Sequence, residues 1–386
     1  MGTLLCAGCS RPASPPQPQI THPAYDPTLV PKEVATLTES VKQDPKGAIA
    51  FGNLSAAYLK LYRQTGEIQQ AMLAEQAARR SLAIRTKRNE IAYLRLAQSL
   101  NSQHRFTEAF QAAKKATELL PRYQDAGLLC AEIALEQGDY DIAQNYWRRF
   151  APSPPSLGSK AMEARMLWLN GSSEKSLSAY QEALAGAEKS YDISNESLAW
   201  FYWKTGECFE NMGRGKEAEV HYKSALQHFP ADYRVLNAMT RLMAERKDWQ
   251  GVLECGKRAV AIVPSPETIG LLGDAYNALG QPKQGEREFR LLDNISRLNQ
   301  KQGNTYDRQR ALFLSDHRRH LGEALQLAQN ELKIRHDVYA YDTLAWCLYQ
   351  NGRLTEAKQA MRKALARGTK ERRFQAHAKK ILAGRE

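Results

Sequence analysis

The sequence has 386 residues, of which 43% are hydrophobic and 25% are charged. This composition provides enough apolar side chains for a core and excludes disorder along the whole chain. No stretch reaches the roughly 18–20 consecutive apolar residues that a membrane-spanning helix needs. The net charge is +12, and residues 353–386, with 11 Lys or Arg and 3 Glu, carry +8 of it. A basic end of this kind suits acidic lipid, nucleic acid or an acidic protein, but a solvated helix face explains it more simply.

Residues 1–31 are predicted to form a linker, because residues 11–31 contain seven of the 16 prolines, and proline removes backbone donors and fixes φ. The segment Leu4–Ser10 resembles the end of a bacterial lipoprotein signal, in which Cys9 would take the lipid. Cys6 stands where that pattern has Leu, and no basic and apolar leader precedes it, so we expect either the remnant of a signal whose true start lies upstream or a chance match. We expect a lipid-anchored protein of the cell envelope, with a cytoplasmic protein as the alternative. Cys6 and Cys9 form a lone C-x-x-C, so no zinc site is expected there.

From about residue 48 onward, apolar residues recur at helical spacing and are interrupted by Gly or Pro about every 15–20 residues, which predicts helical hairpins. Small and aromatic residues then recur in the same order in units that start at residues 90, 124, 157, 199, 233, 266, 305 and 338. The steps between these starts are 34, 33, 42, 34, 33, 39 and 33 residues. A degenerate earlier unit lies around Leu54, Tyr58 and Ala74, and its inter-helix turn is expected to be lengthened near residues 63–70. The sequence is therefore predicted to be an array of repeats.

The unit that starts at Ala199 shows the pattern most fully, with Gly206, Phe209, Gly213, Ala218, Tyr222, Ala225 and Pro230. Such units resemble the tetratricopeptide-repeat (TPR) family, and the order of the units resembles bacterial members of that family. The resemblance covers about residues 48–371. It implies an all-α fold, a right-handed superhelical solenoid of eight to nine antiparallel helix pairs. We place the solenoid at residues 32–371 and a C-terminal capping helix at residues 372–386.

The residue types at fixed positions give the resemblance a physical basis. Alanines where two helices cross let the backbones approach closely, and aromatic residues such as Trp147, Tyr180, Tyr222 and Phe289 fill the gap to the next unit. Turns between paired helices are predicted at Gly138, Gly213, Gly280 and Gly352. The capping helix should bury Phe374, Ile381 and Leu382. The two long steps predict longer helices or loops around residues 185–196 and 294–304.

No enzyme, cofactor or metal site is expected, because the repeats leave no room for a catalytic domain. Residues 213–216 lack the spacing of a phosphate-binding loop, and the segment Asp316–His320 lacks further metal ligands. A solenoid that reads RNA needs polar readers over a basic groove at equivalent positions. Here acidic residues such as Glu132 and Glu207 alternate with basic ones and would repel phosphate. Nucleic acid is therefore not expected as the partner of the groove, and binding of nucleic acid or anionic surfaces through the basic C-terminal end is kept as the alternative function.

The resemblance implies a non-catalytic scaffold that binds a peptide or a helix of a partner protein in a concave groove formed by the first helices. Asn and Arg can hydrogen-bond a peptide backbone, and Trp offers rigid apolar contact, although each Trp is equally suited to packing between repeats. The candidate groove residues are Asn101, Trp168, Trp203, Glu207, Asn237, Arg241, Asn277, Arg310, Trp346 and Tyr349. The Lys/Asn/Arg clamp of chaperone-binding TPR domains is absent in register, which argues against a chaperone tail as the ligand.

Overall fold

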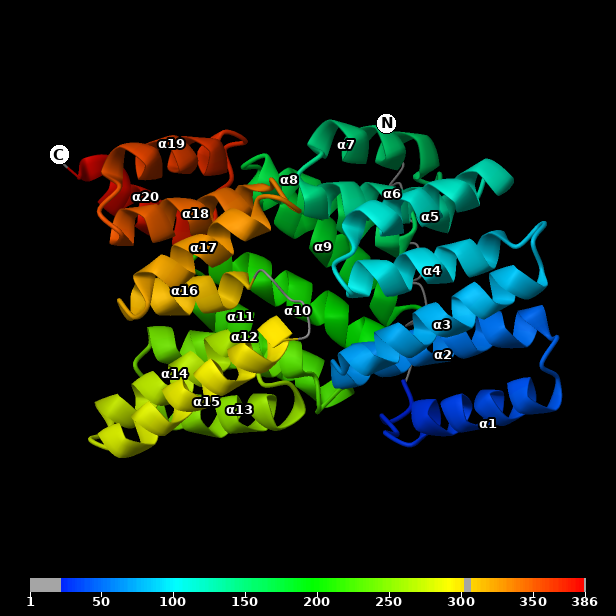
Figure 1. The fold of residues 1–386 in the computed structure, drawn as a ribbon, viewed down its shortest axis with the longest axis horizontal. Helices are drawn as coiled ribbons and strands as arrows, with labels where there is room; N and C mark the ends of the chain where they lie inside the picture. Colours follow the sequence, from blue (N-terminus) through cyan, green and yellow to red (C-terminus); the bar gives the residue numbers. More distant parts are fainter. Residues whose placement is uncertain (1–21, 302–306, 385–386) are drawn as a thin grey trace, which may run out of the picture.

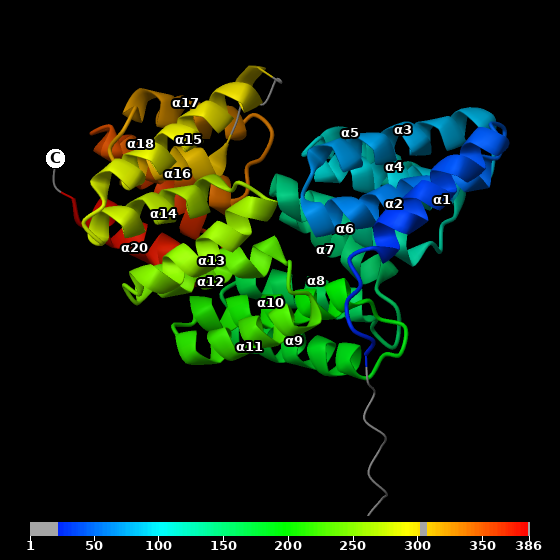
Figure 2. The same ribbon diagram turned by 90° about the horizontal axis from the view of Figure 1, so that it is seen from below.

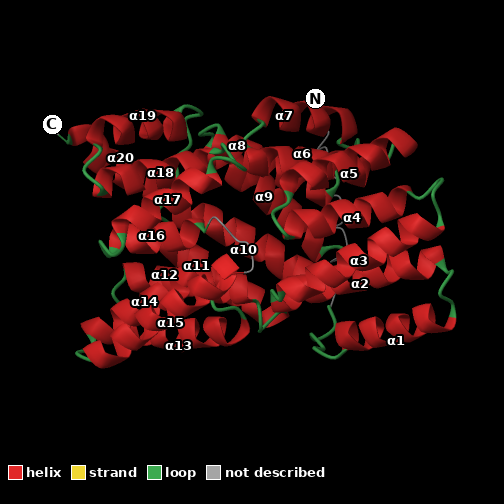
Figure 3. Ribbon diagram, in the orientation of Figure 1, coloured by secondary structure: helices red, strands yellow, loops and turns green. Residues whose placement is uncertain are grey.

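The computed structural model describes residues 22–301 and 307–384, and in these residues all regular elements are α-helices (Figure 3). The helices are α1 (Leu29–Gln43), α2 (Ala48–Thr65), α3 (Ile68–Ile84), α4 (Glu90–Ser102), α5 (Phe106–Leu119), α6 (Gln124–Gln137), α7 (Tyr140–Phe150), α8 (Leu157–Leu169), α9 (Ser173–Glu188), α10 (Asn195–Asn211), α11 (Gly215–His228), α12 (Tyr233–Glu245), α13 (Trp249–Ile262), α14 (Pro266–Ala278), α15 (Pro282–Lys301), α16 (Arg308–Asp316), α17 (Leu321–Glu331), α18 (Val338–Gln350), α19 (Leu354–Leu365) and α20 (Arg372–Ala383). From α2 onward, each even-numbered helix up to α18 pairs with the helix that follows it. The predicted all-α solenoid of helix pairs is confirmed.

The turns inside the helix pairs lie where the sequence predicts them. Gly138, Gly213, Gly280 and Gly352 have φ angles of 92°, 79°, 75° and 76°, the left-handed region in which glycine avoids a steric penalty. In the α4–α5 turn, a non-glycine residue, His104, takes the left-handed conformation, with a φ of 58°.

Small residues at the helix crossings bring the paired helices close together. Ala218 and Ala225 of α11 are fully buried, and a Cβ added to Gly206 of α10 would lie 2.5 Å from Cε1 of Tyr222. Tyr222 is itself fully buried, and its hydroxyl donates to Glu210 of α10. The crossing of α10 and α11 is therefore packed too tightly to accept a larger side chain at position 206.

The structure corrects three expectations. The first turn is short, because α2 extends to Thr65 and α3 begins at Ile68, so the extra residues lengthen helix α2 instead. Helix α1 begins at Leu29, inside the predicted linker. In the capping helix α20, Phe374 and Ile381 are fully buried as predicted, but Leu382 is 45% exposed.

The two repeat spacings that exceed the regular period, of 42 and 39 residues, correspond to longer helices, as predicted. Helix α9 has 16 residues and α10 has 17, and α15 extends over 20 residues.

The solenoid winds tightly enough for distant repeats to touch. Figure 2 shows α1–α7 on one side and α14–α18 with α20 on the other, with α8–α13 between them. The connection before α18 lies on the α6–α7 turn, where the His336 backbone N–H donates to the Gln137 carbonyl at 2.9 Å and the Val338 N–H donates to the Tyr140 hydroxyl at 2.9 Å. Side chains of α6–α8 and α18–α20 share one apolar cluster, and these helices lie side by side in Figure 1.

Glycines permit this contact between turns of the superhelix. A Cβ on Gly171, in the α8–α9 turn, would lie 2.2 Å from the Gly368 carbonyl oxygen, and one on Gly138 would lie 2.6 Å from the Asp337 backbone nitrogen. Larger residues at these two positions would push the turns apart.

The segment that leads into α1 lies against the middle of the chain. The Tyr25 ring is 4.8 Å from the Phe229 ring at the end of α11, and the Asn195 side-chain amide donates to the Pro23 carbonyl at 2.8 Å. Residues 22–25 thus connect α1 to α10 and α11.

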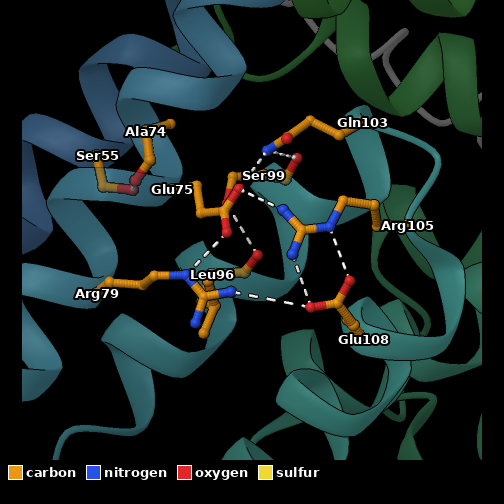
Figure 4. Close-up of polar contacts among 9 residues, drawn as sticks. All are labelled: Ser55, Ala74, Glu75, Arg79, Leu96, Ser99, Gln103, Arg105 and Glu108. Atoms are coloured by element: carbon orange, nitrogen blue, oxygen red, sulfur yellow. Dashed lines mark hydrogen bonds and ion pairs between the residues drawn. The ribbon is translucent and has the colours of Figure 1, made fainter. Parts of the chain in front are cut away.

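Polar networks join neighbouring repeats on their surface. In Figure 4, Glu75 of α3 accepts hydrogen bonds from Arg79, Gln103 and Arg105, each at 2.8 Å, and Arg105 also pairs with Glu108 of α5. Burial opposes the charge of Glu75, but these hydrogen bonds and the two guanidinium groups outweigh it and lower the pKa of Glu75.

Candidate functional site

A cavity of about 210 Å³, called the central cavity here, lies where α8 and α10 meet α18 and the start of α20. Its walls are Arg165, Trp168, Tyr180, Lys204, Glu207, Cys208, Asn211, Tyr339 and Glu371. The first helices of two consecutive repeats supply six of these residues, and Tyr339 and Glu371 come from the returning C-terminal repeats. The cavity therefore exists only because the superhelix closes on itself.

Arg165 is fixed at the cavity wall by an acidic partner from the preceding repeat. Its Nη2 donates to Glu136 Oε1 at 2.6 Å, and Arg335 contacts the other oxygen of Glu136 at 3.0 Å. Burial disfavours the charge of Glu136, but the two guanidinium groups outweigh it and lower its pKa to about 2. Since the Arg165 side chain remains 30% exposed, its charge is oriented and still reachable from the cavity.

The lining of the cavity also carries an ion pair and a buried carboxyl group. Lys204 Nζ pairs with Glu207 one turn later on α10, and this attraction outweighs burial and raises the pKa of Lys204. Trp168 Nε1 donates to Glu371 Oε2 at 2.9 Å. Burial raises the pKa of Glu371, and the nearby charge of Arg373 offsets only part of that effect. The cavity thus presents two cations, two carboxyl groups and three aromatic rings.

The cavity is suited to binding more than to nucleophilic chemistry. Burial raises the pKa of the Cys208 thiol to about 11, so the thiolate that would act as a nucleophile is scarce at neutral pH. Burial also raises the pKa of Tyr180. Lys204 stays protonated for the reason given above, and a protonated amine is not a nucleophile.

Beyond the cavity, the start of α20 covers part of the inner surface of the solenoid, which is the surface formed by the first helices of the repeats, such as α10 and α12. Arg241 of α12 donates to both carboxylate oxygens of Glu210, at 2.7 and 3.1 Å. Arg372, the first residue of α20, contacts the Glu210 carbonyl at 3.3 Å and the Glu245 carboxylate at 2.9 Å. A partner that reaches the middle repeats must therefore approach beside this segment.

The structure brings two of the ten predicted groove residues, Trp168 and Glu207, to the central cavity. Arg241 lies on the same inner surface. Trp203 lies under the cations of Lys204 and Arg234, at 4.8 and 5.5 Å from its ring, and its Nε1 has no hydrogen-bond partner in the described chain.

The other predicted residues are spread along the solenoid. Asn237 accepts from the Thr268 hydroxyl at 2.6 Å, Asn277 is exposed, and the Asn101 side-chain oxygen is buried without a partner among the described residues. Tyr349 stacks on Trp346 at 5.4 Å.

Arg310 and Trp346 are corrected from groove to core. Arg310 is 4% exposed, because Asp293 of α15 and Glu323 of α17 both pair with its guanidinium group. Trp346 is 3% exposed, stacks on His377 at 4.3 Å and donates to Asp316. Neither side chain offers a surface to a partner in this conformation.

Arg165, Lys204, Tyr339 and Glu371 were not predicted from the sequence as site residues. Arg165 occupies the first-helix position equivalent to Glu207, and Lys204 lies one turn before Glu207, so the repeat register carried a signal for both. Tyr339 and Glu371 had none, because a repeat register does not say which distant repeat returns to the middle of the chain.

Three further expectations concern anchors and metals. Cys9 lies outside the described residues, so lipidation there stays a prediction. Across residues 22–301 and 307–384, no three His, Cys, Asp or Glu side chains are grouped as metal ligands would be. Among the helices in those ranges, none is both long enough and apolar enough to span a bilayer.

Residues 338–367, which form α18 and α19, match the family model described as "Tetratricopeptide repeat". No curated protein sequence matches the chain. A solved structure of an IFIT1 monomeric mutant with m7Gppp-AAAA is similar at a TM-score of 0.57 with 12% identity, over 86% of this chain and 76% of that one.

Two other solved structures are similar at lower scores. A tetratricopeptide repeat protein from Parabacteroides merdae has a TM-score of 0.45 and 12% identity, over 61% of this chain and 87% of that one. The APC/C hetero-tetramer Cut9–Hcn1 has a TM-score of 0.38 and 15% identity, over 92% of this chain but only 52% of that one, so this chain spans about half its length.

Residues 338–367 of the α18–α19 pair match the tetratricopeptide-repeat model, and the preceding helix pairs pack in the same manner, so the chain has the fold of a tetratricopeptide-repeat solenoid.

Proposed function

We propose that this protein is a non-catalytic interaction scaffold that holds a segment of a partner protein on the inner surface of its solenoid, at the central cavity. The observation that carries the proposal is the composition of that cavity. Charged side chains held in fixed orientations by Glu136 and Glu207 stand beside the rings of Trp168 and Tyr339. Oriented charges give specificity, and rigid aromatic rings give binding energy.

The proposal is tested by affinity purification from the native organism with charge-matched variants. Glu207→Gln removes a carboxylate from the cavity, and Glu217→Gln removes one from the outer helix α11, where Glu217 is 44% exposed and pairs with Arg214. We expect the proteins that co-purify with the wild type to fall about ten-fold with Glu207→Gln, the equivalent of about 1.4 kcal/mol, and to be unchanged with Glu217→Gln. Equal recovery with both variants, at unchanged helicity, contradicts binding at the cavity.

The alternative function, binding of nucleic acid or anionic surfaces through residues 353–386, receives little support from the structure. Arg353 pairs with Glu356, Arg372 pairs with Glu245 and Arg373 lies 3.4 Å from Asp342, so several of the basic side chains are already neutralised within the chain. The two functions differ in salt dependence, because release of counterions makes nucleic-acid affinity fall steeply with salt. The co-purified material should therefore resist nuclease treatment and moderate salt.

A further inference from the structure

A second groove lies at the N-terminal end of the solenoid, far from the central cavity in the chain. An open depression of about 490 Å³ is lined by α1, α2 and α4, and a second cavity of about 200 Å³ lies at the start of α2 and α4. Asn53 of α2 lines both cavities. The two cavities thus lie next to each other along α2, and together they are called the N-terminal groove here.

The groove follows one face of α2. Ile49, Asn53, Ala56 and Lys60 line it in that order, and their spacing of three to four residues places them on one stripe of the helix. The stripe is about 16 Å long at 1.5 Å per residue, which matches about five residues of an extended peptide.

Two exposed aliphatic side chains lie on the rim of the groove. Ile49 is 69% exposed and Ile91 of α4 is 53% exposed, and both line the smaller cavity. Exposed aliphatic side chains that border a cavity gain free energy when a partner covers them. The residues that line the two cavities include no aromatic ring, and single-stranded nucleic acid relies on such rings for stacking. The rim therefore favours a protein segment over nucleic acid.

The floor of the groove is basic. Arg95 of α4 donates through Nη1 to Gln98 at 2.9 Å, while its Nε is buried and has no hydrogen-bond partner among the described residues. Arg85 and Arg88 add two exposed cations at the smaller cavity, where Glu90 is the acidic side chain. In the larger cavity Glu33 is neutralised by Lys60 at 2.9 Å. A guanidinium group that lines a cavity and is only partly hydrogen-bonded within the chain is well suited to pairing with a carboxylate.

We propose that the N-terminal groove binds an extended protein segment that carries carboxylates and at least one aliphatic side chain. A carboxylate pairs with Arg95 in the floor, a second faces Arg85 and Arg88, and the aliphatic side chain covers Ile49 and Ile91. Residues 1–21 of this chain contain one Arg and no Asp or Glu, and the segment that follows them is held at α10 and α11. The chain's own N-terminal arm is therefore not the complement of this groove.

The probe is a fluorescein-labelled hexapeptide that alternates acidic and aliphatic residues, and its control has lysine in place of each acidic residue. Fluorescence anisotropy with the full chain should show binding of the acidic peptide and about ten-fold weaker binding with Arg95→Ala. Arg362→Ala, an exposed position on α19, is the matched control and should bind as the wild type does. Ile49→Ala should weaken binding about three-fold, while Val220→Ala, at the 62% exposed Val220 of α11, should have no effect.

Three results would overturn the proposal. These are no binding of the acidic peptide, equal binding of the lysine peptide, or equal affinity of the Arg95→Ala and Arg362→Ala variants. An oligonucleotide that displaces the acidic peptide and binds more tightly would assign the groove to nucleic acid instead. Glu207→Gln should leave peptide affinity unchanged, so failure at this groove is distinguishable from failure of the proposed role of the central cavity.

Discussion

Replacing Glu210 by Ala should destabilise the middle of the solenoid more than any surface change. The Glu210 side chain is 6% exposed and accepts two hydrogen bonds from Arg241 and one from the hydroxyl of the fully buried Tyr222. Removing one partner of a buried ion pair costs about 3–5 kcal/mol, and a buried hydroxyl without an acceptor adds about 1–3 kcal/mol. Arg241 remains 32% exposed and keeps Glu267 at 3.7 Å, which relieves part of the loss. We expect a decrease of about 4 kcal/mol in the free energy of unfolding.

Urea denaturation followed by helical circular dichroism measures this change, and hydrogen exchange shows where it occurs. Exchange should rise first in α10–α12, because repeats in a solenoid contact mainly their neighbours. Glu217→Ala on the exposed face of α11 is the control and should cost no more than about 0.5 kcal/mol. Tyr222→Phe leaves the ion pair intact and should cost about 1 kcal/mol. If Glu210→Ala is as stable as Glu217→Ala, the buried network does not hold the middle repeats together.

Three further predictions concern packing, pH and reactivity. Gly206→Ala should lower the free energy of unfolding by about 1–3 kcal/mol, because the added Cβ would clash with Tyr222. Gly322→Ala, in helix α17 with open space around the site, should raise it by about 0.5–1 kcal/mol. Thermal melts of both variants check this. The pKa of Glu75 is lower when folded than its ordinary value of 4.5, so its stabilisation is present above pH 4.5 and is lost as pH falls through the folded pKa. The stability difference between the wild type and Glu75→Gln should be full at pH 7 and should shrink as the pH is lowered below 4.5. Cys130 is fully buried and its pKa is raised to about 12, so a thiol reagent at pH 8 should modify it only after unfolding, and rapid labelling of the folded protein would contradict its burial.

The repeat pattern predicted the local structure well because helix pairs depend on neighbouring residues. Glycines at the turns and alanines at the crossings report contacts between helices that are adjacent in sequence. The first turn was mispredicted because extra residues can lengthen a helix as easily as a loop, and the signal that the helix is lengthened is Gly66, which caps the end of α2 in the left-handed conformation. Leu382 was placed in the core by composition, although the last turn of α20 turns it towards solvent.

The candidate site was predictable only in part. Trp168 and Glu207 follow from the first-helix register, whereas Tyr339 and Glu371 reach the same cavity through the pitch of the superhelix. That pitch depends on small rotations at every interface and on close backbone contacts such as that of Gly171 with Gly368. Burial of Arg310 and Trp346 has the same origin, because the register identifies a first helix but does not say what later covers it.

Site-specific photocrosslinking in cells of the native organism tests most directly whether the inner surface binds a partner. A photoreactive phenylalanine analogue is placed at Asn211, which lines the central cavity, and separately at Lys223, which is 63% exposed on the outer helix α11. A discrete crosslinked protein at position 211 that is absent at position 223, and that is reduced by Glu207→Gln, is the expected result. The same products at both positions, or products at position 223 alone, would contradict an inner binding surface.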